Sequence, residues 1–240
     1  MRVKNRLLDF DSVIYQDDDW FKFSLDSLLL VNFVTINLRC KKIIDLACGN
    51  APIPMLLSYK TNSFIYGIEL QKCVYDLGVS SINENKMNSQ IELINGDVRE
   101  INKFFDSDCF DIVLCNPPYF KVSDDGYLND NEVKRIARHE IELTLDDVLK
   151  NARYLLKNGG IFAMVHRSER FIEIITKMRE YNMEPKKVQF VYAKEGRNSD
   201  LFLIEGVKNG KSGIKILPGL VVSNEDGSYT DIVRNMFSNR

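Results

Sequence analysis

The sharpest chemical signal in the sequence is Asn116-Pro117-Pro118-Tyr119, which directly follows the apolar run 110–115. Two prolines stiffen this loop and remove two N–H donors, so its carbonyl groups point outward as fixed acceptors. The side chain of Asn116 adds another carbonyl acceptor, and the ring of Tyr119 adds a flat face. Two acceptors and a stacking face would together hold a planar amino group on an aromatic base. The alternative is a proline turn without chemistry.

Three further candidates also lie at the ends of apolar runs. The small-residue turn DLACGNA, 45–51, contains Gly49, whose backbone freedom would let a ligand approach the chain closely. Glu69 comes about 20 residues later and could accept hydrogen bonds from both hydroxyls of a ribose. Asp97, in an Asn-Gly-Asp sequence, could accept from the exocyclic amine of a purine. Each has a structural alternative: a plain strand-to-helix turn, a surface glutamate and an ordinary polar turn.

The elements that must position these residues alternate between strands and helices. The apolar runs predict seven strands, at 41–47, 64–69, 91–95, 110–115, 160–166, 186–193 and 200–207. Helical patterns and caps predict helices at 24–38 with Ser24 as N-cap, from about 54, at 71–87, at 144–157 with Thr144 as cap and Gly159-Gly160 at its end, and at 168–182.

This alternation predicts an α/β fold with a mostly parallel sheet covered on both faces, and the last two strands form an antiparallel hairpin. In such sheets, ligands bind at the carboxyl ends of the strands, where the strand order reverses. The candidate residues all follow strands, so the fold would bring them to that edge.

Composition excludes several other classes of protein. The chain has 240 residues, 45% of them apolar, and a formal net charge of −2, which excludes disorder and a wholesale polycation. Five scattered cysteines and two histidines give no zinc-ligand spacing and suit a reducing cytoplasm. The N-terminus lacks a signal-peptide core, and the apolar stretch 28–34 is too short to span a bilayer. We therefore expect a cytoplasmic protein without a metal or a membrane association.

The ordered motifs DLACGNAPIPMLLS, GIELQ, NGDVRE and DIVLCNPPYF resemble those of class I S-adenosylmethionine-dependent methyltransferases of the small-domain type. Within that group the chain resembles the bacterial tRNA adenine-N6 methyltransferases, which modify the adenine 3′ of the anticodon (position 37) in valine tRNA. The resemblance runs from Phe23-Ser24-Leu25-Asp26 to Gly227-Ser228-Tyr229-Thr230, nearly the whole chain. It implies a Rossmann-like sheet of seven strands in the order 3-2-1-4-5-7-6, with an N-terminal extension and helix at 1–40 packed on a methyltransferase domain at 41–240.

The resemblance also implies the roles of individual residues. It makes Asp45 a contact to the methionine part of the cofactor and Gly49 a contact through its backbone. It makes Glu69 the ribose clamp, and Asp97 with Val98 the adenine contact. The full set of implied cofactor residues is Asp26, Asp45, Ala47, Gly49, Asn50, Glu69, Leu70, Asp97, Val98 and Asn116, and the implied catalytic residues are Asn116, Pro117, Pro118 and Tyr119. Asp26 would face the cofactor's polar end, or else be a helix-start carboxylate favoured by the dipole.

Two positions depart from the family pattern. Family members usually carry glycine where this chain has Ala47 and Ala51. A methyl group at either position narrows the pocket for the methionine part of the cofactor. We expect binding to survive only if both backbones keep φ below zero.

The expected reaction is transfer of the methyl group to N6 of adenine, with tRNA as partner and a monomeric enzyme. Acceptors on N6 would favour a pyramidal nitrogen and stabilise its developing positive charge. RNA contacts must come from a local basic surface. The primary candidates are Lys121, Lys134, Arg135, Arg138, His139 and Arg197, with Arg2, Lys4, Arg6, Lys186, Lys187 and Lys194 as further ones. The long loop 120–140 would be a lid or substrate loop.

Other functions remain open on the sequence. The Asn-Pro-Pro-Tyr loop also serves glutamine-N5 methylation of release factors, although those enzymes carry a helical N-terminal domain and only about 40 residues precede the first strand here. Guanine-N2 methyltransferases of rRNA usually have Phe where this chain has Tyr119. DNA adenine methyltransferases usually need a target-recognition domain, and none is visible. An NAD-dependent oxidoreductase would need a GxGxxG turn, and a non-catalytic RNA-binding module is the remaining alternative.

Overall fold

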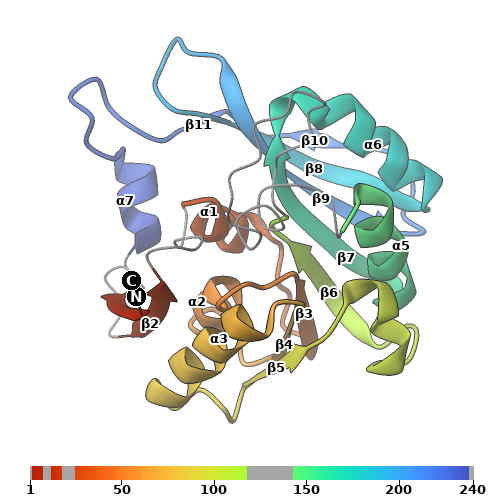
Figure 1. Ribbon diagram of the computed structural model, residues 1–240. Coiled ribbons are helices and arrows are strands. Elements are labelled where there is room, and N and C mark those ends of the chain that lie inside the picture. Colours follow the sequence, from red (N-terminus) through yellow and green to blue (C-terminus); the bar gives the residue numbers. More distant parts are fainter. Residues whose placement is uncertain (1, 8–11, 18–24, 118–142, 238–240) are drawn as a thin grey trace, which may run out of the picture.

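A mostly parallel sheet forms the centre of the computed structural model, which describes residues 2–7, 12–17, 25–117 and 143–237 (Figure 1). Its main strands are β3 (Lys42–Leu46), β4 (Phe64–Glu69), β5 (Ile91–Asn95), β6 (Phe110–Cys115), β7 (Leu156–Arg167), β8 (Met183–Tyr192) and β9 (Ser199–Lys208). They are ordered β8-β9-β7-β6-β3-β4-β5, so in chain order the predicted arrangement 3-2-1-4-5-7-6 is confirmed. Two short strands that the sequence did not predict, β10 (Lys215–Ile216) and β11 (Leu220–Val221), pair in parallel with β8.

The direction of the strands sets the edge at which a site can form. Strands β3 to β7 pair in parallel with one another. Strand β9 lies antiparallel between β7 and β8, which confirms the predicted C-terminal hairpin. The sheet order reverses between β3 and β6, and these two strands are direct neighbours. The carboxyl ends of β3 and β6 therefore meet at the switch point where ligands of such sheets bind.

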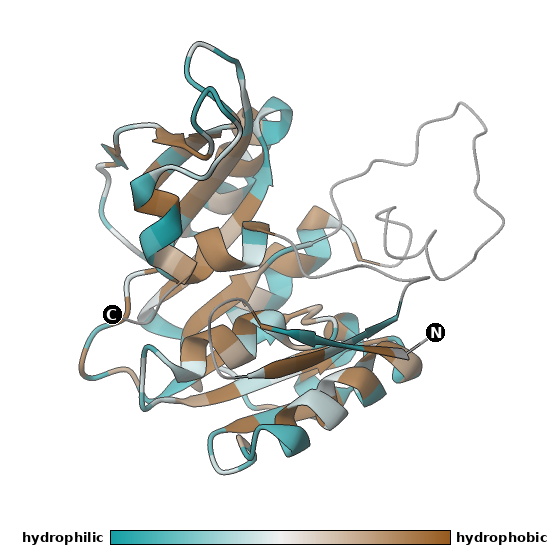
Figure 2. Ribbon diagram, turned by 90° about the vertical axis from the view of Figure 1, so that its left-hand side faces the viewer, coloured by the Kyte–Doolittle hydropathy of each residue, from teal (hydrophilic) through white to brown (hydrophobic). Residues whose placement is uncertain are grey.

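Helices cover both faces of the sheet. On one face lie α1 (Leu25–Phe33), α2 (Pro52–Ser58), α3 (Lys72–Glu84) and, beside α1, α7 (Asp231–Phe237). On the other lie α5 (Leu145–Leu155), α6 (Phe171–Glu180) and the 3-10 turns η1 (Val98–Lys103) and η2 (Ser168–Arg170). Each layer buries its own apolar cluster against the strands, which Figure 2 shows as brown arrows between the helices. Among the described residues, no helix is long and apolar enough to cross a membrane.

An N-terminal hairpin, which the sequence analysis missed, packs against α3. Its strands are β1 (Arg2–Arg6) and β2 (Val13–Asp17). Asn85 bonds both backbone groups of Val13, and Ser81 Oγ accepts from the Tyr15 N–H at 2.9 Å. Ile14 points inward and is fully buried with the α1–α3 layer. The division into 1–40 and 41–240 stays a prediction, and the predicted cap Ser24 lies outside the described residues.

The first helix is shorter than predicted, because side chains from the C-terminal hairpin take over its end. It ends at Phe33 rather than at residue 38. Lys187 Nζ donates to the Phe33 carbonyl at 2.7 Å, and a Glu205 carboxylate oxygen accepts from the Thr35 N–H at 2.7 Å. Because these side chains already satisfy backbone hydrogen-bonding groups at the end of the helix, a further helical turn is not needed to pair them.

The fifth long strand begins earlier than predicted. The cap at Thr144 is confirmed as a reciprocal capping box with Asp147. The helix then passes directly into β7 at Leu156, so the predicted stop at Gly159-Gly160 is wrong. Gly160 instead serves a close approach, since a Cβ there would lie 3.2 Å from the Asp111 carbonyl, where the register between β6 and β7 shifts.

Candidate functional site

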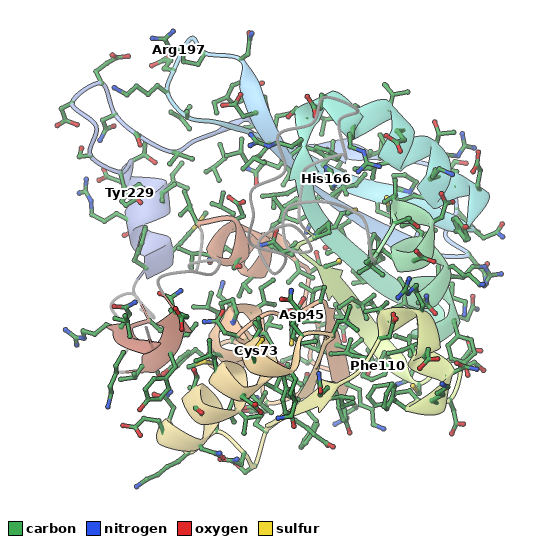
Figure 3. All side chains as sticks on the ribbon, viewed as in Figure 1. Asp45, Cys73, Phe110, His166, Arg197 and Tyr229 are labelled. Atoms are coloured by element: carbon green, nitrogen blue, oxygen red, sulfur yellow. The ribbon has the colours of Figure 1, made fainter. Side chains whose placement is uncertain are left out.

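Asp45 is a buried carboxylate without a hydrogen-bond partner at the end of β3. Its side chain is 1% exposed, and neither carboxylate oxygen has a partner among the described residues. Burial, followed by the charge of Glu69, raises the pKa of Asp45 well above its usual range. Figure 3 shows Asp45 in the interior near the middle of the molecule. An unpaired buried carboxylate is rare, and it is well suited to receive a cationic group from a ligand.

The turn after β3 is held in an unusual backbone conformation. Ala47, Gly49 and Ala51 all have positive φ, at 56°, 59° and 70°. The condition set by the sequence analysis, that both alanines keep φ below zero, is therefore not met, because the tight return of the chain into α2 places left-handed residues at both positions. The strain falls on two residues that carry a Cβ, at about 1–2 kcal/mol each. Gly49 faces open space, since a Cβ built on it would meet no atom within 4 Å.

Glu69 closes the far side of this turn. Its Oε2 accepts from the Gly49 N–H at 2.9 Å and its Oε1 from the Gln71 N–H at 2.8 Å. Burial raises the pKa of Glu69, and these backbone donors oppose that rise. The carboxylate is thus fixed at the end of β4, where the sequence places the ribose clamp, and each oxygen keeps a further lone pair for a hydroxyl donor.

The structure gives Asp97 a local role that the sequence analysis did not anticipate. Its carboxylate caps η1 by accepting from the Arg99 N–H at 2.8 Å. The Arg99 guanidinium also bonds both of its oxygens, with Nε at 3.0 Å from each, and lowers the pKa of Asp97. Contact with adenine stays a prediction that requires Arg99 to share this carboxylate. Two other predicted cofactor contacts differ in their exposure: Val98 is buried in the core, and Leu70 is 42% exposed.

Asn116 and Pro117 follow β6, next to the turn that follows β3. Leu46 and Cys115 are register partners, so the residues after them leave the sheet side by side. Asn116 Nδ2 donates to the buried Ser27 Oγ of α1 at 3.2 Å, a contact that the sequence did not suggest. With the amide nitrogen engaged there, the hydrogen-bond acceptor at the other corner of the side chain is its carbonyl oxygen. Pro118 and Tyr119 lie outside the described residues.

The remaining predicted cofactor residues lie around this edge. Asp26 is in the first turn of α1 and is half-buried, one residue before Ser27. Asn50 is buried, and its Nδ2 donates to the Tyr15 carbonyl of the N-terminal hairpin at 2.8 Å. The missed hairpin therefore reaches the turn after β3. The β-branched and aromatic residues Val13, Ile14 and Tyr15 were the available sequence signal for that strand.

The basic residues predicted to bind RNA are only partly described. Lys121, Lys134, Arg135, Arg138 and His139, together with the proposed lid 120–140, lie outside the described residues. Arg197 is exposed at the tip of the β8–β9 hairpin, well away from Asp45 (Figure 3). Lys187 is committed internally, since its Nζ lies 2.9 Å from a Glu205 carboxylate oxygen. RNA contacts stay predictions.

These features fit the cofactor that the sequence resemblance implies. S-adenosylmethionine carries an ammonium group, a ribose and an adenine. The partnerless Asp45 carboxylate matches the ammonium, and the open space above Gly49 matches a ligand close to the backbone. The assignment of individual residues to these groups stays a prediction.

Comparison with known protein families shows that one family model matches most of the chain. A family model described as a methyltransferase domain matches residues 39–218. A relative from Haemophilus influenzae is 25% identical over 221 residues, covering 91% of this chain and 90% of the relative. Another from Photobacterium profundum is 24% identical over 185 residues, covering 76% of this chain and 75% of the relative. Both are named tRNA1(Val) (adenine(37)-N6)-methyltransferase.

Solved structures share the fold at low sequence identity. A protein of Agrobacterium tumefaciens described as a predicted O-methyltransferase superposes with a TM-score of 0.72 at 16% identity, covering 90% of this chain and 96% of that one. Geranyl diphosphate C-methyltransferase of Streptomyces coelicolor, solved with S-adenosyl-L-homocysteine, gives a TM-score of 0.56 at 12% identity, over 76% and 79% of the two chains. These likenesses confirm the Rossmann-like fold predicted from the sequence.

Proposed function

This chain belongs to the family of methyltransferase domains, and from that premise we propose that it uses S-adenosylmethionine to methylate N6 of an adenine in tRNA. The observation that carries the proposal is the placement of Asn116-Pro117 at the end of β6, beside the cofactor turn that follows β3. Two relatives that this chain matches over 75% and 90% of their length are named for adenine 37 of a valine tRNA. Their names support that base as the target.

The acceptors after β6 suit an aromatic amine as nucleophile. The lone pair of such an amine is shared with its ring, so the amine attacks poorly until it becomes pyramidal. Hydrogen bonds from the amine to the Asn116 side-chain oxygen and the Pro117 carbonyl would favour that shape and stabilise the developing positive charge. The hydrogen bond from Asn116 Nδ2 to Ser27 Oγ would hold the amide in the orientation that this role requires. No strong base is needed, because the methylated amine is acidic and loses its proton to solvent.

The other residues of the edge would bind and orient. When bound, S-adenosylmethionine supplies an electrophilic methyl group on a sulfonium. Asp45 would hold the ammonium, Glu69 the ribose hydroxyls, and Asp97 the adenine. Alignment of the reacting groups would supply much of the rate enhancement. The target base must leave its stack at a cost of a few kcal/mol, and stacking on Tyr119 would offset about 1–3 kcal/mol of that.

The test is nucleoside mass spectrometry after incubating the protein with tRNA and isotopically labelled cofactor. We expect label in N6-methyladenosine from a valine tRNA transcript, and none when adenine 37 of that transcript is replaced by guanine. A release-factor domain and an rRNA fragment should be tested in parallel, because the same loop serves glutamine-N5 methylation. Label in glutamine or in N2-methylguanosine, with none in adenosine, would replace the proposal by one of those activities.

A further inference from the structure

Gln16 of the N-terminal hairpin carries a buried amide that is half satisfied. The residue is 6% exposed, and its Oε1 accepts from Asn5 Nδ2 at 2.9 Å. Its Nε2 is buried and has no hydrogen-bond partner in the part of the chain that the structure describes. Buried side-chain donors are almost always paired, so a buried NH₂ group without a partner points to a missing acceptor. Because Asn5 holds the oxygen, the amide presents its nitrogen elsewhere.

The position of Gln16 links that missing acceptor to the cofactor turn. The carbonyl of the preceding residue, Tyr15, accepts from Asn50 Nδ2 at 2.8 Å. Strand β2 runs along α3 from Asn85 towards Ser81, and so towards the carboxyl edge of the sheet. Gln16 faces inward with Ile14 from the strand that Figure 1 shows beside α2 and α3.

The turn itself is short of hydrogen-bond donors. Its N–H groups are largely used within the fold: Cys48 donates to the Ile68 carbonyl at 3.0 Å, Gly49 to Glu69, and Ala51 to the Cys48 carbonyl at 3.0 Å. Of the buried polar side chains around it, Asn50 donates to the Tyr15 carbonyl, and Asp45 and Glu69 are carboxylates that only accept when ionised. This edge suits an ammonium group and hydroxyls, but it offers little to a carboxylate. The methionine part of S-adenosylmethionine carries both an ammonium and a carboxylate.

We propose that Gln16 Nε2 donates to the carboxylate of the cofactor's methionine part. The two polar groups of that part are then divided, the ammonium to Asp45 on β3 and the carboxylate to Gln16 on β2. Asn5 is a positioning residue, because its bond to Oε1 fixes which end of the Gln16 amide donates. The inference rests on the cofactor site proposed above and is independent of the methyl acceptor.

Three ligands separate these contacts in a binding measurement by calorimetry. S-adenosylhomocysteine has both the ammonium and the carboxylate, decarboxylated S-adenosylmethionine keeps only the ammonium, and 5′-methylthioadenosine has neither. Gln16→Met preserves size and removes the donor. We expect it to weaken S-adenosylhomocysteine at least tenfold, or about 1.4 kcal/mol, and to leave the other two ligands within about twofold of wild type. Asn5→Ala should give the same ligand pattern with a smaller loss.

A matched control makes the same chemical change far from the turn. Gln189 lies on β8 and donates to the Pro218 carbonyl at 3.0 Å, so Gln189→Met should leave all three affinities unchanged. Melting curves of each variant without ligand check that it folds, and Asn5→Ala keeps the test available if Gln16→Met does not. Equal losses for all three ligands, or unchanged affinity for S-adenosylhomocysteine, would overturn the role of Gln16. Failure of the wild-type protein to bind S-adenosylhomocysteine would overturn the cofactor site and this inference together.

Discussion

Replacing Asp45 by Asn should stabilise the cofactor-free protein while weakening cofactor binding. The carboxylate is 1% exposed and neither oxygen has a partner among the described residues. Asparagine has nearly the same shape and removes the charge but not the polarity. The fold without ligand therefore loses an unfavourable buried charge, and the complex loses the partner of the ammonium group.

The magnitudes follow from the burial and the partners of Asp45. A buried acceptor without a partner costs about 1–3 kcal/mol, and more when charged. An unpaired amide keeps part of that cost, so we expect a gain of about 1–2 kcal/mol in the free energy of unfolding. For a chain of this length, that gain raises Tm by roughly 2–8 °C. Loss of a charge-assisted hydrogen bond should weaken the cofactor by about 1.5–3 kcal/mol, or roughly ten- to a hundredfold.

Thermal melts with and without S-adenosylhomocysteine measure both effects, and calorimetry gives the affinity directly. Asp111→Asn is the matched control, because Asp111 lies near the opposite end of the sheet and is fully engaged. It accepts from Lys157 Nζ at 2.7 Å and from the N–H groups of Lys41 and Lys42 at 2.8 and 3.0 Å. That variant should lower Tm and leave cofactor affinity unchanged.

The pH dependence gives a second measurement of the same carboxyl group. Because burial raises the pKa of Asp45 in the folded state, ionising this group costs the folded state more than the unfolded state. The neutral carboxyl group therefore contributes its full stability below the unfolded pKa of about 3.9, and this contribution is lost as pH rises. The stability difference between Asp45→Asn and wild type should therefore grow from about pH 4 upward. Cofactor affinity of wild type should fall as acid protonates Asp45. A lower Tm for Asp45→Asn without ligand, at neutral pH, would refute the argument from the unpaired carboxylate.

Four further predictions concern the site and its substrate. Asn116→Ala should nearly abolish methyl transfer in single-turnover assays with saturating tRNA while cofactor affinity stays near wild type; near-normal turnover would contradict the amine-gripping mechanism. Glu69→Ala should weaken the cofactor by a few kcal/mol at most and lower Tm, since two backbone N–H groups lose their acceptor; unchanged affinity in calorimetry would remove it from the site. Ala47→Gly should raise the free energy of unfolding by up to about 1 kcal/mol in denaturant melts, because the strain relieved at a φ of 56° exceeds the extra conformational entropy that glycine loses on folding. A loss of stability would show that Ala47 is not strained. Charge reversal of Arg135 with Arg138 should weaken tRNA binding and flatten its salt dependence; no change in either would exclude these residues from the RNA contact.

The central sheet was predictable because its signals are local. Strands 64–69, 91–95 and 110–115 have the predicted bounds, since each is an apolar run ended by a polar turn. The hairpin β1–β2 was missed because RVKNR is mostly polar and VIYQD has only three residues that favour a strand, so the two segments form strands by pairing with each other against α3. Tertiary contact, not local preference, determines that element.

The positions of the candidate site residues in the sheet were predictable from the sequence, but their electrostatics were not. Motif order located Asp45, Glu69 and Asn116 at adjoining strand ends, and the sheet order confirms that β3, β4 and β6 are neighbours. No sequence pattern could reveal that Glu69 is bonded by two backbone donors while Asp45 has none, because that depends on how the turn folds back. The engagement of Asp97 by Arg99 is likewise a matter of side-chain conformation.

The turn after β3 concentrates two kinds of unfavourable feature, and they should respond differently to the cofactor. The Asp45 carboxylate lacks a partner only while no cationic ligand is bound. Replacing the carboxylate should therefore raise the stability of the cofactor-free protein and lower its affinity for the cofactor. The left-handed conformation of Ala47 belongs to the backbone, and it persists whether or not a ligand is bound. Glycine at that position should relieve the strain in both states and remove a methyl group that narrows the pocket. Stability and affinity should therefore move in opposite directions in Asp45→Asn, and should not oppose each other in Ala47→Gly.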